Sequence, residues 1–170
     1  YDSTKNELYR EIAENTENLL DKAFENYDTL SHDLGFMWHL SSGASYRLTG
    51  NKKSYVRNMF AANTLAGRYN IKGGFIRAWN GPGRTGWAII DCMMNIPLLY
   101  WASEEVKDER FKHIAVKQAD MCARDHVRDD GTINTKEFDD KSKKFVKVEG
   151  NIGEENIRAI DSKRLDSIYV

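Results

Sequence analysis

Apolar residues recur every three to four positions through most of the chain, and this spacing predicts a largely helical protein. A first helix, capped by Ser3 or Thr4, is expected to reach about Thr29. Its acidic side chains would face the solvent and its apolar side chains the core. The apolar set consists of Leu8, Ile12, Leu19, Leu20 and Ala23.

Two further helices are expected before the middle of the chain. Asp33 stands where the second helix would begin, and Gly50 would end it. Asn51 is a favourable cap for the third, which is expected over 52–69. The apolar stripe of this third helix is wide and comprises Tyr55, Val56, Met59, Phe60, Ala62 and Leu65.

The pattern changes after the glycine pair Gly73 and Gly74, which would stop the third helix. The elements expected beyond it are a short extended piece over 75–79, a glycine-rich loop over 80–86, and two helices over 93–105 and 108–126. Alternating apolar residues then predict a small β-hairpin from 133–138 and 145–148.

An internal repeat is indicated by two aspartates. Asp91 follows Asp33 by 58 residues, and each precedes an apolar helix, a short break and a second helix. Two helical hairpins aligned by accident would give the same pattern. A true repeat predicts stacked hairpins, as in an α/α toroid, with both aspartates at equivalent helix starts facing one cleft.

Length and composition fit one soluble globular domain. The 170 residues are 30% charged and 41% hydrophobic, whereas a complete toroid would need roughly 250 residues or more. Apolar runs fall short of the ~20 residues that cross a bilayer, and the first residues do not resemble a signal peptide. We therefore expect a cytoplasmic protein without membrane contact, unless a leader was removed. A net charge of −1 argues against a nucleic-acid partner.

The charges are distributed unevenly. Residues 1–30 carry eight acidic and three basic side chains, whereas no acidic residue lies between Asp33 and Asp91, a segment that contains eight lysines and arginines. Such a basic segment is either a solvated surface or an attraction for a carboxylate or sulfate ligand. Asp33 by itself could be a simple helix cap. Asp91 lies in an apolar run, where burial would favour its protonated form and suit it to general acid catalysis.

Other motifs carry less weight. Gly81, Gly83 and Gly86 match the spacing of a dinucleotide-binding loop but lack the preceding β-branched strand and the following acidic residue. The histidines have no zinc-like spacing, and we expect no metal and no cofactor. Cys92 and Cys122 are expected to be buried free thiols. Beside the glycine-rich loop, Trp79 is suited either to the core or to packing on a sugar ring.

Three motifs, in this order and spacing, resemble the unsaturated glucuronyl hydrolases of glycoside hydrolase family 88. They are HDLGF at 32–36, FIRAWN at 75–80 and IDCMMNIPLLYW at 90–101, and the agreement extends from about Thr4 to Gly131. The resemblance implies an all-α (α/α)6 toroid built of helical hairpins. It also implies removal of a 4,5-unsaturated glucuronic acid from the non-reducing end of lyase-generated glycosaminoglycan oligosaccharides, by hydration of the vinyl ether double bond.

The same resemblance implies roles for individual residues. Asp91 matches the residue that protonates the double bond and activates water, and Asp33 matches a second carboxylate that positions the substrate. His32, Trp79 and Asn95 fall among the substrate-binding residues. The partner implied is therefore an acidic unsaturated oligosaccharide.

The chain departs from the family pattern toward its end. The family's substrate-binding histidine is replaced, at Asn134 or Thr135, and its later helices are missing beyond about Phe138. We therefore expect 1–150 to be the N-terminal half of the toroid domain, incomplete as a ring, and 151–170 an unassigned tail. A homo-oligomer could cover the open half toroid. The alternatives are a non-catalytic remnant, or an unsaturated rhamnogalacturonyl hydrolase of the same fold.

Overall fold

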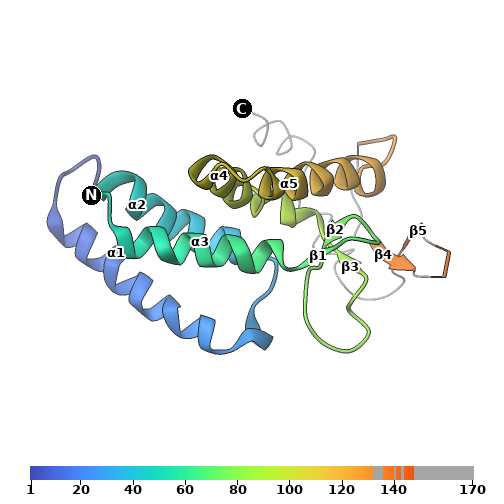
Figure 1. Ribbon diagram of the computed structural model, residues 1–170, viewed down its shortest axis with the longest axis horizontal. Helices are drawn as coiled ribbons and strands as arrows, with labels where there is room; N and C mark the ends of the chain where they lie inside the picture. Colours follow the sequence, from blue (N-terminus) through green and yellow to red (C-terminus); the bar gives the residue numbers. More distant parts are fainter. Residues whose placement is uncertain (132–135, 140, 143, 148–170) are drawn as a thin grey trace.

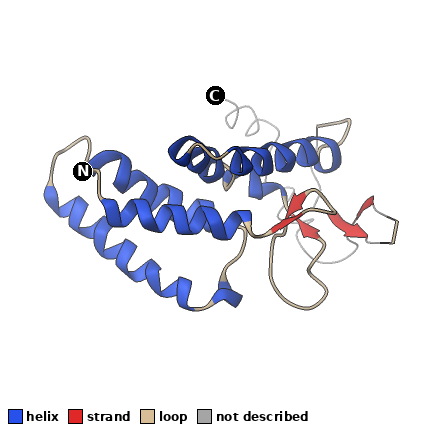
Figure 2. Ribbon diagram, viewed as in Figure 1, coloured by secondary structure: helices blue, strands red, loops and turns tan. Residues whose placement is uncertain are grey.

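A computed structural model describes residues 1–131, 136–139, 141–142 and 144–147. These residues are mainly helical, and their short strands gather toward one end (Figure 1, Figure 2). The α-helices are α1 Glu7–Leu20, α2 Ala44–Thr49, α3 Lys52–Ala66, α4 Pro97–Val106 and α5 Glu109–Met121. Shorter 3-10 or π-helical pieces are η1 Asp21–Glu25, η2 Tyr27–Thr29, η3 Gly35–Gly43, η4 Ile90–Met94 and η5 Cys122–His126. The predicted tail 151–170 lies outside the described residues.

Two helical hairpins form the body of the protein, as the repeat predicts. In the first, η3 and α2 run to Gly50, whose positive φ of 71° ends the helix, and α3 returns. Asn51 caps α3, because its side chain accepts a hydrogen bond from the Lys53 backbone N–H at 2.9 Å. In the second hairpin, α4 begins with Pro97 in its first turn and α5 is capped by Asp108. The all-α class is thereby confirmed.

The hydrophobic core lies between these hairpins. Its largest fully buried side chains include Trp38 from η3, Leu65 from α3, Leu98 from α4 and Phe111 from α5. Each such side chain contributes about 1.5–3 kcal/mol by its removal from water. The core therefore fixes η3 relative to α4, and these helices follow directly after the segments that carry Asp33 and Asp91.

The strands form two small antiparallel sheets. In one, β1 Tyr69–Asn70 pairs with β2 Phe75–Ile76, and in the other β3 Trp87–Ala88 pairs with β4 Lys136–Asp139, which also pairs with β5 Lys144–Lys147. The pairing of β4 with β5 confirms the predicted hairpin for the described part of 133–138 and 145–148, while 133–135 and 148 lie outside the described residues. The two sheets are tied by a hydrogen bond from the Ala78 backbone N–H to the Trp87 carbonyl oxygen at 2.9 Å, which holds 75–80 beside β3.

The first helix differs from its prediction in length. α1 begins at Glu7, capped by Asn6 rather than by Ser3 or Thr4, and it ends at Leu20. The chain continues through η1 and η2, so the expected single helix is broken into three pieces. Residues near the break, Leu20 and Ala23, still pack against the core as expected.

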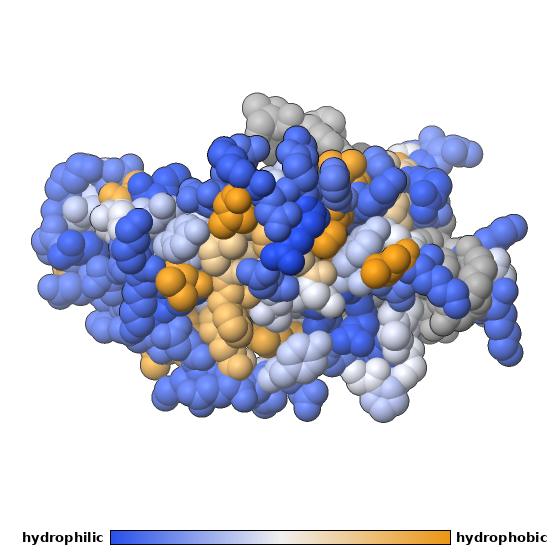
Figure 3. All heavy atoms as spheres, viewed as in Figure 1, coloured by the Kyte–Doolittle hydropathy of each residue, from blue (hydrophilic) through white to orange (hydrophobic). Residues whose placement is uncertain are grey.

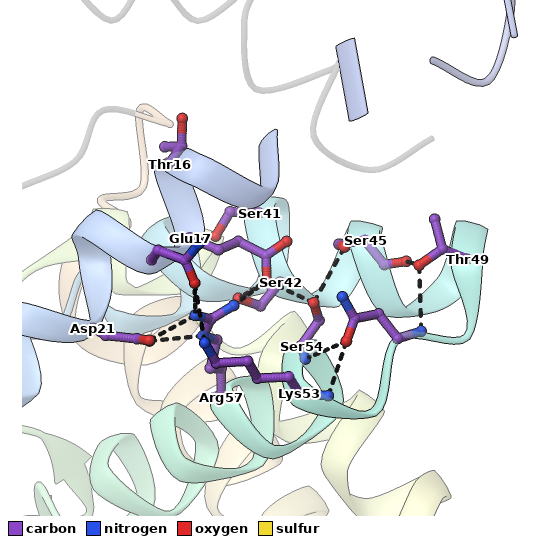
Figure 4. Close-up of polar contacts among 12 residues, drawn as sticks. Thr16, Glu17, Asp21, Ser41, Ser42, Ser45, Thr49, Lys53, Ser54 and Arg57 are labelled. Atoms are coloured by element: carbon purple, nitrogen blue, oxygen red, sulfur yellow. Dashed lines mark hydrogen bonds and ion pairs between the residues drawn. The ribbon is translucent and has the colours of Figure 1, made fainter. Parts of the chain in front are cut away.

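The side of α1 that faces the protein is the polar one, which is the reverse of the prediction. Glu17 is buried, while Leu8, Ile12 and Leu19 are each more than half exposed. Glu17 accepts hydrogen bonds from Ser42 at 2.9 Å and Ser54 at 2.6 Å (Figure 4). Helical periodicity shows which residues share a face, but hydroxyl groups on η3 and α3 decide which face docks.

Arg57 on α3 supplies the charge that makes this docking possible. Its guanidinium binds Asp21 through two hydrogen bonds, at 2.7 and 2.6 Å, and it reaches Glu17 at 3.2 Å (Figure 4). A buried carboxylate is costly unless it is paired and hydrogen-bonded, and this network provides both. The pKa of Arg57 is raised, chiefly by its hydrogen bond to Asp21.

The apolar stripe predicted for α3 is only partly buried. Ala62 and Leu65 are in the core, whereas Val56 and Phe60 are each more than half exposed. Apolar side chains gather near the middle of the molecule on the face shown in Figure 3. Within the described part of the chain, no helix has the length and apolar run that a membrane crossing requires.

Candidate active site

His32 is the buried centre of the candidate site. Its backbone N–H donates a hydrogen bond to the Ala78 carbonyl oxygen at 2.9 Å, and its ring Nδ1 lies 3.0 Å from the same oxygen. A carbonyl oxygen only accepts hydrogen bonds, so Nδ1 carries a proton in this arrangement. The side chain is 1% exposed, and its other nitrogen, Nε2, faces the two carboxylates.

Asp33 and Asp91 meet at this nitrogen. Nε2 of His32 lies 3.0 Å from Asp91 Oδ1 and 3.4 Å from Asp33 Oδ1. Neither contact is aligned as a hydrogen bond, so their attraction is that of ion pairs with a protonated ring. The fold therefore brings together three of the five predicted site residues, two of them 58 positions apart in the sequence.

The two carboxylates favour the protonated ring. Burial by itself lowers the pKa of His32, but the close contact and charge of Asp91 and the charge of Asp33 outweigh it, so the pKa is raised. An imidazolium placed between two carboxylates offsets their mutual repulsion. His32 thus holds together two acidic groups that would otherwise repel each other.

Both carboxylates remain open to solvent. The Asp33 and Asp91 side chains are 48% and 50% exposed, so the burial expected for Asp91 is wrong. η4, which contains Asp91, is one short turn at the surface, and it is Cys92, the next residue, that points into the core. Asp33 does not act as a helix cap, because Leu34 holds the cap position of η3 and no side chain caps this helix. Asp33 Oδ2 accepts a hydrogen bond from Ser31 at 2.9 Å. Exposed carboxylates beside a buried cation can bind a ligand and exchange protons with it.

A close contact between Gly35 and Asn95 sets the distance between the two aspartates. A Cβ atom on Gly35 would lie 2.2 Å from the Asn95 carbonyl oxygen, so only glycine fits here. The side-chain oxygen of Asn95 accepts a hydrogen bond from the Phe36 N–H at 2.6 Å, and its Nδ2 donates to the Asp91 carbonyl oxygen at 3.3 Å. Asn95 is buried and connects η3, which contains Phe36, to η4, which contains Asp91. Its expected role in substrate binding stays a prediction.

Trp79 forms a side wall beside His32. The two rings meet edge to face, with centroids 5.5 Å apart, and Trp79 also contacts the Trp87 ring at 5.9 Å. Trp79 is half-buried, so part of its ring is available to a ligand. Gly81 and Gly83 have positive φ in the following loop, which leads into β3 and not into a helix. The dinucleotide-binding arrangement is therefore excluded for this loop.

Other reactive groups near the site are less suited to chemistry. Cys92 and Cys122 are buried free thiols, as predicted, and burial raises the pKa of both. His32, Asp33 and Asp91 offer ligand atoms within 4.8 Å of one another, a grouping that could accept a cation if Nε2 lost its proton. The expectation of a site without metal therefore stays a prediction.

Sequence reasoning missed the residues that hold the site in place. Ser31 and Gly35 flank the HD pair, and their proximity to it was the signal available. Arg68 is one of the eight basic residues between Asp33 and Asp91, for which the sequence suggests either a solvated surface or a ligand contact. In the structure it is buried and hydrogen-bonded to the carbonyl oxygens of Leu30 and Ala78. No sequence pattern separates a buried arginine from an exposed one.

Comparison with known proteins is consistent with this geometry. No family model matches the chain. An unsaturated chondroitin disaccharide hydrolase of Streptococcus agalactiae is 42% identical over 106 residues, which are 59% of this chain and 26% of that protein. An unsaturated glucuronyl hydrolase of Bacillus sp. strain GL1 is 33% identical over 144 residues, which are 82% of this chain and 38% of that protein.

Solved structures agree in fold. A crystal structure of unsaturated glucuronyl hydrolase from Streptococcus agalactiae superposes with a TM-score of 0.78 at 35% identity, covering 86% of this chain and 38% of that one. A second structure, an aspartate-to-asparagine variant with dGlcA-Glc-Rha-Glc, has a TM-score of 0.81 at 30% identity and covers 91% of this chain and 42% of that one.

The fold and the solved relatives define the class of structure: the described residues are helical hairpins of an α/α toroid. Within that class, the chain is similar to the unsaturated glucuronyl hydrolases, as the motifs predict. It spans between 26% and 38% of the length of these curated relatives.

Proposed function

We propose that this chain carries the acid–base centre of an enzyme that removes 4,5-unsaturated glucuronic acid from glycosaminoglycan oligosaccharides. One observation carries the proposal: two half-exposed carboxylates, Asp33 and Asp91, meet at the Nε2 atom of the buried His32. Relatives whose names state this activity support the choice of substrate. A solved relative in complex with dGlcA-GalNAc6S supports an acidic, sulfated disaccharide as the ligand.

The proposed reaction is hydration of the vinyl ether. Protonation of such a double bond occurs at C4, because the cation that forms at C5 is stabilised by the ring oxygen. Asp91 donates this proton from its carboxylic acid form, which the carboxylate reaches by taking a proton from solvent or from the His32 imidazolium at 3.0 Å. Water then adds its oxygen to C5, and the resulting Asp91 carboxylate takes a proton from that water. The resulting hemiketal opens, the sugar rearranges, and the glycosidic bond breaks without direct attack on it. Asp91 ends the cycle in the protonation state in which it began.

The remaining residues hold the substrate and the charges. Asp33, fixed by Ser31, can accept hydrogen bonds from sugar hydroxyls beside the double bond. Trp79 offers part of its ring for packing against the apolar face of the sugar. His32 keeps Asp33 and Asp91 close together, so that one bound sugar can contact both.

A matched pair of disaccharides tests the reaction. The chain is expected to release the reducing-end sugar from an unsaturated chondroitin disaccharide and to leave the saturated counterpart intact, because the chemistry requires the double bond. Release would be measured by chromatography, with a pectin-derived unsaturated disaccharide as a third sample. Equal cleavage of the saturated compound would contradict hydration, and faster cleavage of the pectin-derived compound would favour the rhamnogalacturonyl alternative.

We further propose that a second copy of the chain covers the exposed apolar side chains. These include Leu40 on η3 and Val56 and Phe60 on α3, each more than half exposed. Apolar side chains gather in the middle of the face shown in Figure 3, and large exposed apolar patches are uncommon on monomers and mark interaction sites. Sedimentation equilibrium is expected to give twice the 19.6 kDa mass of one chain. A purely monomeric mass at micromolar concentration would contradict the pairing.

A further inference from the structure

Arg68 is a buried cation that the proposed chemistry does not use. It lies just after α3 and is 4% exposed. The oxygens that accept its hydrogen bonds are all neutral. Burial, with a contribution from the neighbouring Arg77 charge, lowers the pKa of Arg68 to about 10, so its guanidinium still carries a charge at neutral pH. Burying a charge costs free energy unless its hydrogen-bond donors are satisfied, and neutral oxygens satisfy the N–H groups of Arg68.

Those donors join the two segments that carry the site. Nη1 of Arg68 donates to the Leu30 carbonyl oxygen at 2.9 Å, two residues before His32. Nη2 donates to the Ala78 carbonyl oxygen at 3.0 Å, one residue before Trp79. The planar fork of a guanidinium fixes the relative positions of the oxygens that it binds, which a lysine ammonium does not.

Asn80 strengthens the same junction from the other side. Its side-chain oxygen accepts a hydrogen bond from Arg68 Nη1 at 3.1 Å, and its Nδ2 donates to the Leu30 carbonyl oxygen at 3.0 Å. The Leu30 carbonyl oxygen thus accepts hydrogen bonds from both Arg68 and Asn80, and these two side chains are also hydrogen-bonded to each other. The backbone entering His32 therefore has little freedom to shift relative to the segment 77–80 that contains Ala78.

The Ala78 carbonyl oxygen is the point where Arg68 meets His32. It accepts hydrogen bonds from Arg68 Nη2 at 3.0 Å and from the His32 backbone N–H at 2.9 Å, and it lies 3.0 Å from His32 Nδ1. The contact with this oxygen fixes the orientation of the His32 ring, with Nδ1 toward Ala78. Once Nδ1 is bound here, Nε2 is left between Asp33 and Asp91.

We propose that Arg68 is a positioning residue of the site: by holding the Ala78 carbonyl, it fixes the His32 ring so that Nε2 lies between the two carboxylates. None of the hydrogen bonds that Arg68 donates goes to Asp33 or Asp91, and the contact that links it to the site is the Ala78 carbonyl oxygen beside His32. The kinetic part of this inference rests on the function proposed above. The structural part, which is the fixed orientation of the His32 ring, is independent of that function.

Proton NMR of the imidazole tests the structural part on the whole chain. The His32 Nδ1–H signal, assigned by its loss in His32→Gln, is expected to be sharp and slow to exchange. In Arg68→Lys its exchange with water should accelerate at least about tenfold, because the carbonyl that orders it is no longer fixed. The matched control is Arg77→Lys, which loses a guanidinium that donates to Asn80 at 2.7 Å but not to Ala78. An unchanged signal in folded Arg68→Lys would overturn the proposal.

A measurement on the unmodified chain covers the case in which Arg68→Lys does not fold. Two donors directed at one oxygen place their protons close together, so an Overhauser cross-peak is expected between an Arg68 Nη2 proton and the His32 Nδ1 proton. Absence of that cross-peak, with both signals observed, would overturn the proposal without any variant.

Kinetics then separate the inference from the proposed function. In Arg68→Lys, kcat on an unsaturated disaccharide should fall on the order of 10- to 100-fold, because a small displacement of a reacting group is enough to cause it. KM should change little, and Arg77→Lys should retain normal kcat. A chain that shows the expected NMR result without any turnover would contradict the proposed function alone. Normal kcat in Arg68→Lys would contradict the positioning role.

Discussion

Asp91→Asn is expected to reduce turnover of an unsaturated glucuronyl disaccharide by about 10²- to 10⁴-fold while the chain stays folded. Asparagine has the size of aspartate but neither donates a proton to carbon nor accepts one from water at neutral pH. The Asp91 side chain is half exposed, so its replacement leaves no cavity in the core. Steady-state kinetics on the purified variant, with circular dichroism as the check on folding, measure the effect.

The matched control for this variant is Asp120→Asn. Asp120 lies exposed on α5, a helix that contributes none of the residues of the candidate site, and its neutralisation should leave kcat within about twofold of the unmodified chain. Asp33→Asn provides a second comparison, because a residue that positions the substrate should raise KM more than Asp91→Asn does. Undiminished turnover in Asp91→Asn would contradict the assignment of the acid.

The same variant has a consequence for His32 that needs no substrate. Asp91 raises the pKa of His32, so removing its charge should lower that pKa, measured by NMR titration. The direction of the His32 pKa shift also determines how protonation of His32 affects the stability of the fold. Because the folded pKa lies above the ordinary value of 6.5, protonation of His32 stabilises the fold below about pH 6.5, and this contribution is lost as pH rises through the folded pKa. Asp91→Asn should therefore flatten that part of the stability profile.

Gly35→Ala is expected to be the most destabilising single methyl addition near the site. The new Cβ would lie 2.2 Å from the Asn95 carbonyl oxygen and 2.5 Å from its Cα, and backbone atoms cannot turn aside as a flexible side chain can. We expect a loss of at least about 2 kcal/mol in the free energy of unfolding, measured by urea denaturation. Any chain that still folds must separate the segments of Asp33 and Asp91, and it should lose activity as well.

Gly67→Ala is the matched control for this change. Gly67 follows α3 with a φ of −63°, which any residue can adopt. An added Cβ would be 3.4 Å from the nearest backbone oxygens, an ordinary contact. The unfolding free energy should rise by about 0.4–1 kcal/mol or stay unchanged. If Gly35→Ala proved as stable as Gly67→Ala, the close approach of the two hairpins would be contradicted.

Much of the fold follows from local signals in the sequence. Asn51 marks the start of α3 correctly, because capping depends on the backbone immediately beside the residue. The helix expected from residue 93 begins at Pro97 instead, and the one expected from 108 begins at Glu109 with Asp108 as its cap. The orientation of α1 could not be predicted in this way. Glu17 docks because Arg57, forty residues later in the sequence, provides its partner, and helical periodicity contains no information about that contact.

The candidate site, like the fold, could be predicted from the sequence only in part. His32, Asp33 and Asp91 were identified from motifs, and the structure brings them together. The half-exposed state of Asp91 was not foreseen, because an apolar neighbourhood in the sequence does not fix which way one short turn presents its side chain. Nor could the role of Ala78 be read from its residue type, since its contribution to the site is a backbone carbonyl.

The absorbance of the vinyl ether gives the most direct test of the central claim, that His32, Asp33 and Asp91 form a hydrating site. A folded sample of this chain, mixed with an unsaturated chondroitin disaccharide, is expected to remove the absorbance while releasing one equivalent of the second sugar. Calorimetry with the same disaccharide would accompany the measurement. A constant absorbance from a folded sample that binds the disaccharide would contradict the claim and favour a non-catalytic carbohydrate-binding protein.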